Sequence, residues 1–276
     1  MMTLDEIVAL AKRRGFVFPG SEIYGGLANV YDYCPMGAEL LKNIKDAWWR
    51  YFITSREDMV GINTSILTHE SIWKASGHLN GFVDAMIDCK NCQLRTRADH
   101  LIEKFTEEKG EKISVEGLEL SALDVIIKEQ SIPCTNCGSH DWTEVRHFNL
   151  LFPVKLGILE STANTAYLRG ETAQGIFVQF ANILSSTRTK LPFGVGQIGK
   201  SFRNEITKGN FIFRTLEFEQ AEIEFFFDPS TEQWETLFED WKSSMWSFLT
   251  EVLGVTDENL RWREHSEVER SFYSLK

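Results

Sequence analysis

Two arginines, an acid and a phenylalanine lie close together in a stretch of the sequence that has the pattern of a β-hairpin. Phe202 to Glu205 should end one strand, Ile206 to Phe213 should form the loop with Lys208-Gly209-Asn210 at its tip, and Arg214 should open the return strand. Strands joined by a short loop pair antiparallel, and side chains alternate between the faces of a strand. The pattern therefore predicts an antiparallel sheet in which Arg203 and Arg214 lie on neighbouring strands and face the same cleft.

The side chains of this hairpin suit a nucleotide. A guanidinium group carries a planar fork of donors that matches phosphate oxygens, and it stays charged at any working pH. The ring of Phe218 could stack on adenine, so one hairpin could reach both ends of an ATP molecule. The alternative is a surface hairpin with solvated charges, which is the usual meaning of an isolated Arg-x-Glu. The ordered series Phe-Arg-x-Glu, loop, Arg-x-x-x-Phe favours the ATP site.

This hairpin resembles motif 2 of the class II aminoacyl-tRNA synthetases. Three segments narrow the resemblance to glycyl-tRNA synthetases of the homodimeric kind: Tyr167 to Asn182, Gly194 to Thr207, and Tyr31 to Phe52. The resemblance covers nearly the whole chain. It implies an α+β class II catalytic domain, with an antiparallel sheet flanked by helices and a zinc-binding insertion. It also implies a glycine–tRNA ligase, which activates glycine with ATP to glycyl-adenylate and transfers it to tRNA(Gly).

The resemblance assigns roles to the hairpin residues. Arg203 would contact the α-phosphate and the substrate carboxylate, and Arg214 would take the γ-phosphate of a bent ATP. Glu205 would contact the adenine side or hold the loop, and Phe218 would stack on adenine. Magnesium ions would bridge the phosphates. Such a site would work mainly by positioning and electrostatic stabilisation, because activation brings two anions together.

Two acids are candidates for the ammonium group of glycine. Glu171 resembles the ammonium-binding glutamate of the family, and Glu222 on the return strand resembles a second one. The alternative is that they are ordinary acids at a helix start and on a sheet surface. Thr172 and Gln174 could help shape the pocket, and Gly170 stands where the family often has proline. Steric exclusion of a methyl group would then select glycine.

Four of the five cysteines form two knuckles, Cys89-x-x-Cys92 and Cys134-x-x-Cys137. Four thiolates at this spacing predict one tetrahedral, structural zinc site with no open position for substrate. A metal-free insertion is the alternative, and disulfides are the poorer one without a secretory signal. Cys34 stands where the family commonly has glycine, and it is expected to be a tolerated replacement. The spare histidines are expected to be ordinary surface or structural residues: His100, His140 and His147.

Hydrophobic periodicity predicts the remaining elements. Apolar positions recur at three and four residues over Thr3 to Arg14 and Met36 to Phe52, and again over Trp234 to Val252, and these segments should form helices. The stripe from Met36 to Phe52 could pack in the core or, by resemblance to motif 1, form a dimer interface. Gly194 to Phe202 and Leu216 to Phe227 should be strands.

Acids alternate along the second of these strands. Glu217, Glu219, Glu222 and Glu224 recur at short intervals, and acids on one face of a strand at period two indicate a binding site or a solvated face. We expect these four side chains to share a face.

The division expected from these segments has three parts. Residues 1–87 would be the first part of the catalytic core with motif 1, 88–146 the zinc-binding insertion, and 147–276 the second part with motif 2. Charged helical segments at 98–109 and 118–130 lie between the cysteine pairs. Nothing matches the third class II motif or an anticodon-binding domain, so the chain is expected to be an N-terminal fragment.

Composition limits the other functions. The 276 residues are 43% hydrophobic and 12% aromatic, which is ordinary for a globular enzyme domain. A net charge of −11 argues against a broad electrostatic clamp on nucleic acid, so any RNA contact should be local. No run is long enough to span a bilayer and no signal peptide is evident, so a cytoplasmic location is expected.

Two other functions compete with the ligase. One is a non-catalytic, synthetase-derived dimeric protein that binds nucleic acid or serves as an accessory subunit. The other is a zinc-containing interaction fragment. ATP binding would separate both from the ligase, and intact Arg203, Glu205, Arg214 and Glu171 argue against them.

Overall fold

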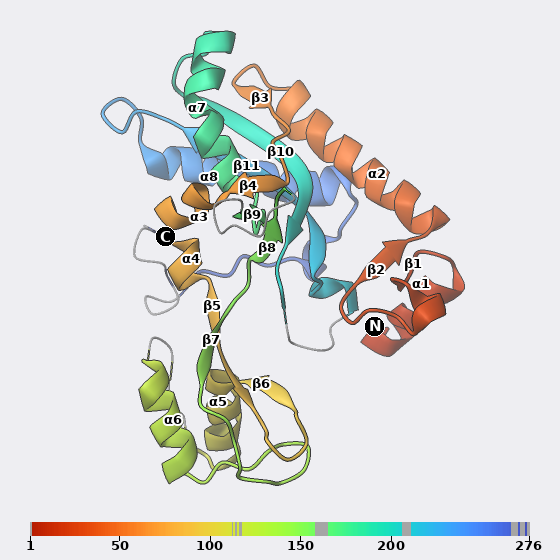
Figure 1. Cartoon of the computed structure of the whole chain (residues 1–276). Helices are drawn as coiled ribbons and strands as arrows, with labels where there is room; N and C mark the ends of the chain where they lie inside the picture. The colour runs from red at the N-terminus through yellow and green to blue at the C-terminus, as the bar shows by residue number, and fades with distance from the viewer. Residues whose placement is uncertain are drawn as a thin grey trace.

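The chain forms a main body of sheets and helices from which a smaller lobe, residues 83–149, projects (Figure 1). The computed structural model describes residues 2–265 apart from 112, 114, 116, 117, 158–164 and 206–210, together with 270 and 274. The tip of the predicted hairpin loop therefore lies outside the described residues.

The β-strands are β1 (Val17–Pro19), β2 (Tyr31–Tyr33), β3 (Met59–Gly61), β4 (Leu67–His69), β5 (Val83–Asp88), β6 (Arg95–Arg97), β7 (Arg146–Asn149), β8 (Phe152–Lys155), β9 (Thr165–Leu168), β10 (Phe193–Phe202) and β11 (Glu217–Phe226). The α-helices are α1 (Leu4–Arg13), α2 (Pro35–Trp49), α3 (Glu70–Ala75), α4 (His78–Gly81), α5 (Ala98–Glu108), α6 (Leu120–Glu129), α7 (Ala173–Thr187) and α8 (Trp234–Ser247). The strands and helices predicted around 194–202, 216–227, 3–14, 36–52 and 234–252 are thus confirmed.

A long hairpin of β10 and β11 forms the centre of the main body. The two strands pair antiparallel from Phe193↔Phe226 to Phe202↔Glu217, as the sequence predicts. The short β3 pairs parallel with β10, so this sheet is mixed and not wholly antiparallel. A second sheet, β4-β9-β8, is antiparallel throughout.

Glycines in β10 let a helix approach the sheet closely. A Cβ at Gly196 would lie 2.1 Å from Cδ1 of Ile53, in the helical turn Arg50–Thr54 that continues α2. A Cβ at Gly194 would lie 2.2 Å from Sδ of Met59 on β3. A side chain at position 196 would force the helix away from the sheet, and one at position 194 would collide with side chains of the neighbouring strands β3 and β11.

Helices cover both faces of this hairpin (Figure 1). On one face α2 and α8, together with the helical turns that follow them, bury a cluster that contains Trp48, Phe52 and Phe248. On the other face α7 contributes Ile176 and Ile183, which pack with residues of β10 that include Phe193 and Val195. The sheet therefore has apolar residues on both sides, as a buried sheet requires.

The stripe on α2 divides into two halves. Its C-terminal half, with Trp48 at 7% and Phe52 at 0% exposure, packs in the core. Its N-terminal half leaves Met36, Leu40 and Ile44 exposed at a spacing of four residues. The core interpretation thus holds for one half, and the other half is open to a partner. Cys34, before α2, has a φ of −86°, which any residue adopts, so this position needs no glycine.

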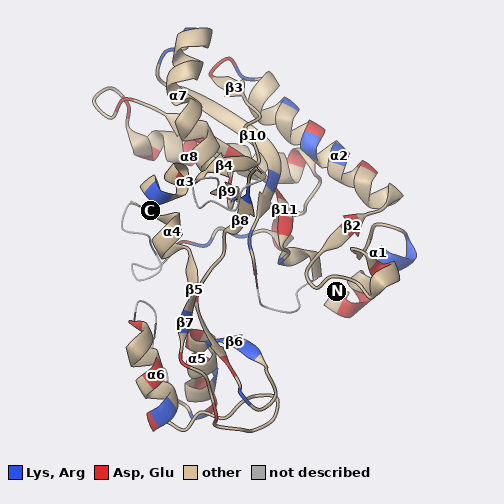
Figure 2. Cartoon of the chain, viewed as in Figure 1, with Lys and Arg blue, Asp and Glu red and all other residues tan. Residues whose placement is uncertain are grey.

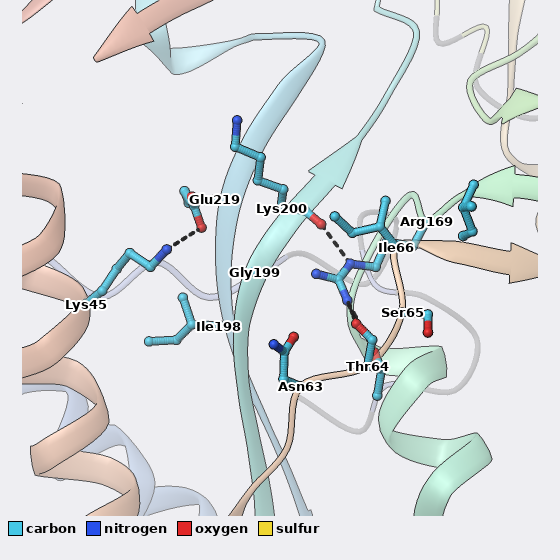
Figure 3. A pocket seen from close by; sticks show the side chains of 11 residues that line it. Lys45, Asn63, Thr64, Ser65, Ile66, Arg169, Ile198, Gly199, Lys200 and Glu219 are labelled. Carbon is cyan, nitrogen blue, oxygen red and sulfur yellow. Dashed lines mark hydrogen bonds and ion pairs between the residues drawn. The ribbon is translucent and has the colours of Figure 1, made fainter. Parts of the chain in front are cut away.

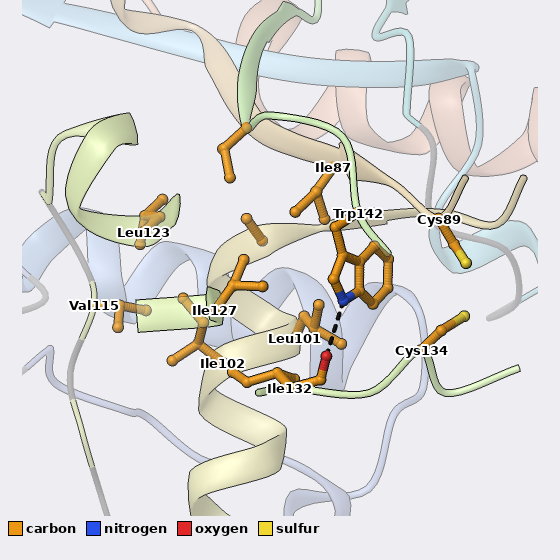
Figure 4. Close-up of a cluster of buried hydrophobic side chains, with 12 residues drawn as sticks. Ile87, Cys89, Leu101, Ile102, Val115, Leu123, Ile127, Ile132, Cys134 and Trp142 are labelled. Carbon is orange, nitrogen blue, oxygen red and sulfur yellow. Dashed lines mark hydrogen bonds between the residues drawn. The ribbon is translucent and has the colours of Figure 1, made fainter. Parts of the chain in front are cut away.

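The smaller lobe has its own core. β6, β5 and β7 form an antiparallel sheet against which α5 and α6 pack, and both predicted helices are confirmed. Trp142 lies in this core beside Cys89 and Cys134, and its Nε1 donates to the carbonyl of Ile132 at 2.9 Å (Figure 4). β5 and β7 pair from Val83↔Asn149 to Met86↔Arg146. The sheet of the smaller lobe therefore begins before residue 88 and ends after residue 146, the predicted boundaries of the insertion. The division of the chain into domains stays a prediction.

Charged side chains of both signs are dispersed over both parts of the molecule (Figure 2). Within the described residues, every helix is too short or too polar to cross a membrane.

Candidate active site

The acids of β11 divide between the two faces of the strand. Glu219 points toward α2, where Nζ of Lys45 lies 2.9 Å from its carboxylate, and Glu217 pairs with Lys200 at 2.8 Å. Glu222 points the other way and accepts a hydrogen bond from the hydroxyl of Thr172. The expectation that all four acids share a face is wrong, because 217 and 219 are odd and 222 and 224 are even.

Thr172, the residue directly before α7, binds the side chain of Glu222 on β11. Thr172 is fully buried, and its hydroxyl donates to Glu222 while its backbone N–H donates to Oε1 of Gln220 at 3.3 Å. The hydroxyl of Ser201 donates to the same Gln220 oxygen at 3.1 Å. Burial raises the pKa of Glu222, and the Thr172 hydrogen bond opposes that rise.

Glu171 lies one residue before Thr172, in an environment that favours its charge. Nε2 of Gln174 donates to its Oε1 at 2.6 Å, and Nε2 of His78 lies 3.3 Å from the same oxygen. The hydrogen bond from His78 is the main reason why the pKa of Glu171 is lowered despite burial. Oε1 of Gln174 is buried with no hydrogen-bond partner among the described residues. Glu171 therefore carries a negative charge at neutral pH.

Glu224 completes an acidic group with Glu222 and Glu171. Burial, followed by repulsion from those two carboxylates, raises the pKa of Glu224 to about 7. Three carboxylates that affect one another in this way create a strongly negative environment. Such a place suits a small cation.

Arg203 lies at the edge of this acidic group. It follows β10 directly, its Nε donates to the carbonyl of Gly170 at 3.1 Å, and its Nη2 is 3.9 Å from Oε2 of Glu171. The guanidinium carbon lies 5.3 Å from the ring centre of Phe218 and 5.2 Å from that of Phe82. A cation and an aromatic ring near the loop end of the hairpin thus lie beside the acidic group.

Arg214 binds Glu205 on the other side of the hairpin loop. Its Nε and Nη2 lie 2.8 and 2.7 Å from Oε2 of Glu205, whose side chain is only 9% exposed. Arg203 and Arg214 thus have different partners, and residues 206–210 between them lie outside the described part of the chain. That both guanidinium groups face one cleft stays a prediction.

A cavity of about 690 Å³ lies on the opposite face of the sheet, toward α2 (Figure 3). Lys45, Lys200 and Glu219 line it, together with Thr64 and Arg169. The buried Arg169 donates to the carbonyls of Lys200 at 2.7 Å and Thr64 at 2.8 Å, so it ties β9 to β10. The predicted site residues do not line this cavity.

The four cysteines of the two knuckles come together at the end of the smaller lobe. Their sulfur atoms all lie within 4.8 Å of one another; those of Cys89 and Cys137 are 3.7 Å apart and those of Cys92 and Cys134 are 3.6 Å apart. Four sulfurs around a zinc ion at about 2.3 Å would be roughly 3.8 Å apart, so the donor set fits the metal. Gly138 follows the second knuckle with a φ of +71°, a conformation that glycine adopts without strain.

Two residues of the site are recognised only in the structure. No metal-ligand or catalytic spacing in the sequence includes His78, and Thr172 is expected from the sequence only to help shape a pocket, whereas it bonds Glu222 and Gln220. The contacts of His78 with Glu171 and of Thr172 with Glu222 join segments that are far apart in the sequence.

Comparison with known proteins identifies the family. The family described as glycyl-tRNA synthetase insertion domain 1 matches residues 112–150. Over 274 residues, 99% of the chain, the sequence is 56% identical to a glycine–tRNA ligase of Geobacillus kaustophilus and 53% identical to one of Caldanaerobacter subterraneus. The chain belongs to the glycyl-tRNA synthetase family. The predicted family resemblance is thus confirmed, and the chain spans 59% of the length of these two glycine–tRNA ligases.

Solved structures support the fold of this glycyl-tRNA synthetase chain. A threonyl-tRNA synthetase structure from Cryptosporidium parvum matches 90% of the chain with a TM-score of 0.53, at 17% identity and over 42% of its own length. A prolyl-tRNA synthetase from the same organism, complexed with halofuginone and AMPPNP, matches 90% with a TM-score of 0.52, at 12% identity and over 34% of its length. The predicted α+β class II fold with antiparallel sheets is confirmed at this level.

Proposed function

We propose that this chain carries the glycine- and ATP-binding site of a glycine–tRNA ligase, which forms glycyl-adenylate and transfers glycine to tRNA(Gly). The observation that carries the proposal is the meeting of Glu171, Glu222 and Arg203 on one face of the β10–β11 hairpin.

Glycine fits this arrangement by charge and by size. Its ammonium group would bind the carboxylate of Glu171, with Glu222 as a second acceptor, and its carboxylate would face Arg203. Thr172 is fully buried beside Glu222, and Oε1 of Gln174, beside Glu171, accepts no hydrogen bond from the part of the chain that the structure describes. A larger substrate would have to displace such residues, and steric exclusion discriminates strongly.

Activation would proceed by attack of a glycine carboxylate oxygen on the α-phosphorus of ATP, with pyrophosphate as the leaving group. Arg203 would stabilise the charge on the phosphorus oxygens, and Phe218 would stack on adenine. Arg214 would take the γ-phosphate and keep Glu205 in place through the ion pair that it already makes. Magnesium would enter with ATP and balance the phosphate charge.

The smaller lobe would hold a structural zinc ion through Cys89, Cys92, Cys134 and Cys137. The side chain of Asn136 lowers the pKa of Cys92 to about 6, which favours a thiolate, whereas burial raises the pKa of Cys134 to about 11. Zinc binding would favour the thiolate form of both cysteines. We also propose that the chain forms a homodimer through the exposed half of α2 and acts in the cytoplasm.

A non-catalytic accessory role is the weaker candidate. Residues that serve only a phosphate grip would have no reason to keep their contacts in such a protein, yet Arg203, Glu205 and Arg214 are all present and engaged.

Titration of the chain with glycylsulfamoyl adenosine, a stable analogue of glycyl-adenylate, tests the proposal by calorimetry. We expect this analogue to bind more tightly than the alanyl and seryl analogues. Arg203→Ala should weaken its binding by about 100-fold, since a charged contact to the phosphate position is lost. Arg261→Ala, an exposed arginine far along the chain, is the control. Preference for the alanyl or seryl analogue, or no binding at all, would contradict the proposal.

A further inference from the structure

His78 connects the acidic group to an aromatic cluster. It begins α4, and its ring centre lies 5.3 Å from that of Trp73 and 5.3 Å from that of Phe82. Its Nδ1 is 2.9 Å from the hydroxyl of Ser76, and its Nε2 is 3.3 Å from Oε1 of Glu171. The His78 side chain is 18% exposed, so neighbours fix the ring on most sides.

The contacts of the ring determine what His78 offers to Glu171. A carboxylate only accepts hydrogen bonds, so a favourable contact requires a proton on Nε2. The single proton of the Ser76 hydroxyl has two acceptors within reach, Nδ1 of His78 at 2.9 Å and the carbonyl of Trp73 at 3.4 Å. Donation to the nearer Nδ1 selects the neutral tautomer with a proton on Nε2. The imidazolium form also carries it. In both forms His78 donates to Glu171.

The two carboxylate oxygens of Glu171 have different contacts. Oε1 receives Nε2 of His78 and Nε2 of Gln174, whereas Oε2 has Nη2 of Arg203 at 3.9 Å, too far for a hydrogen bond. Oε2 therefore keeps its accepting capacity for a ligand. A carboxylate held through one oxygen can present the other without losing rotamer freedom on binding.

We propose that His78 is a positioning residue for substrate, which holds Glu171 so that its Oε2 faces the ammonium group of glycine. This inference rests on the proposed function and adds to it a residue outside the motifs. Phe82 strengthens the connection, because its ring contacts both His78 and the guanidinium group of Arg203. The segment with α4 thus supports residues that face both charged groups of the substrate.

A pair of ligands that differ only in the ammonium group tests this role. Glycylsulfamoyl adenosine carries that group, and acetylsulfamoyl adenosine lacks it. His78→Phe keeps an aromatic ring for packing but removes the donor, so it should weaken binding of the glycyl ligand roughly tenfold or more and that of the acetyl ligand less than about twofold. His78→Gln places an amide donor near the Nε2 position and should recover most of the affinity.

Further variants keep the test decisive. Ser76→Ala removes the partner of Nδ1 without changing the ring, and it should produce a smaller loss that is again confined to the glycyl ligand. His265→Gln, at an exposed position, should change neither affinity. Equal losses for both ligands in the His78 and Ser76 variants, or no loss, would overturn the role of His78 alone. A wild-type chain that does not prefer the glycyl to the acetyl ligand would overturn the proposed function as well.

Discussion

Glu224 shows how burial and neighbouring charge act on a single residue of the site. It lies on the same face of β11 as Glu222, and burial together with Glu222 and Glu171 raises its pKa from 4.5 to about 7. Between these values the folded protein holds a proton on Glu224 that the unfolded chain releases. The free energy of unfolding should therefore fall as pH rises through this interval.

Replacement of Glu224 by glutamine should remove that pH dependence. Glutamine cannot ionise, so Glu224→Gln should be more stable than wild type above pH 7, and the difference should shrink as the pH approaches 4.5. Thermal melting between pH 4.5 and 8.5 measures it. Glu235→Gln, an exposed acid on α8, is the matched control. A constant difference across this range would show that Glu224 titrates normally in the folded protein.

The pKa values of Glu171 and Glu222 are shifted in opposite directions, although the two acids share a site and burial raises the pKa of both. The pKa of Glu171 is lowered because His78 and Gln174 donate to it, whereas that of Glu222 is raised because burial outweighs its single side-chain donor, Thr172. A sequence shows the acids, but it does not show which side chains donate hydrogen bonds to them in the folded protein. The candidate residues could thus be named from motifs, while their protonation could not.

At the scale of the element, local patterns predicted what depends on local spacing. The strands β10 and β11 and the helices α2 and α8 followed from apolar periodicity. The same strand rule, applied to residue numbers 217, 219, 222 and 224, would have separated the acids correctly. The parallel pairing of β3 with β10 and the approach of His78 to Glu171 depend on contacts between distant segments, which periodicity does not encode.

The packing of α7 against the segment before β4 depends on one glycine. A Cβ at Gly175 would lie 2.3 Å from Oγ1 of Thr64, and that hydroxyl cannot move freely because it donates to Gln197 and accepts from Arg169. Gly175→Ala should therefore lower the free energy of unfolding by about 1–3 kcal/mol, measured by urea denaturation. Gly81→Ala, where a Cβ would have no neighbour within 4 Å, is the control. Equal stabilities of the two variants would show that α7 can shift without cost.

The smaller lobe should depend on zinc while the central hairpin does not. Removal of the metal with a chelator, or Cys134→Ser, should increase hydrogen exchange in β5, β6 and α5 but leave β10 and β11 protected, because structural zinc supplies folding free energy locally. Exchange measured by mass spectrometry separates these segments, and metal analysis should find about one zinc per chain. Cys34→Ser, outside the cluster, is the control. Protein that is purified without chelator and contains no zinc would contradict the site.

At the scale of the whole molecule, the exposed half of α2 is the surface on which the proposed dimer depends. Met36, Leu40 and Ile44 are 54%, 50% and 37% exposed and follow one another along one side of the helix. A second copy that covers this stripe would remove apolar area from water, at about 25 cal/mol for each Å² buried. A charge in its centre would have to be desolvated in the interface.

Leu40→Glu should therefore shift the protein toward the monomer. Light scattering coupled to size-exclusion chromatography should show a dimer for wild type and a lower average mass for the variant at the same concentration. Val252→Glu introduces the same charge at an apolar position of similar exposure, 42%, outside the stripe, and should leave the mass unchanged. A monomeric wild type, or a dimer unaffected by Leu40→Glu, would place the interface elsewhere. Lys45 on α2 pairs with Glu219 on β11. Only the helix α2 would therefore separate a dimer interface on its exposed side from the strand that also carries Glu222.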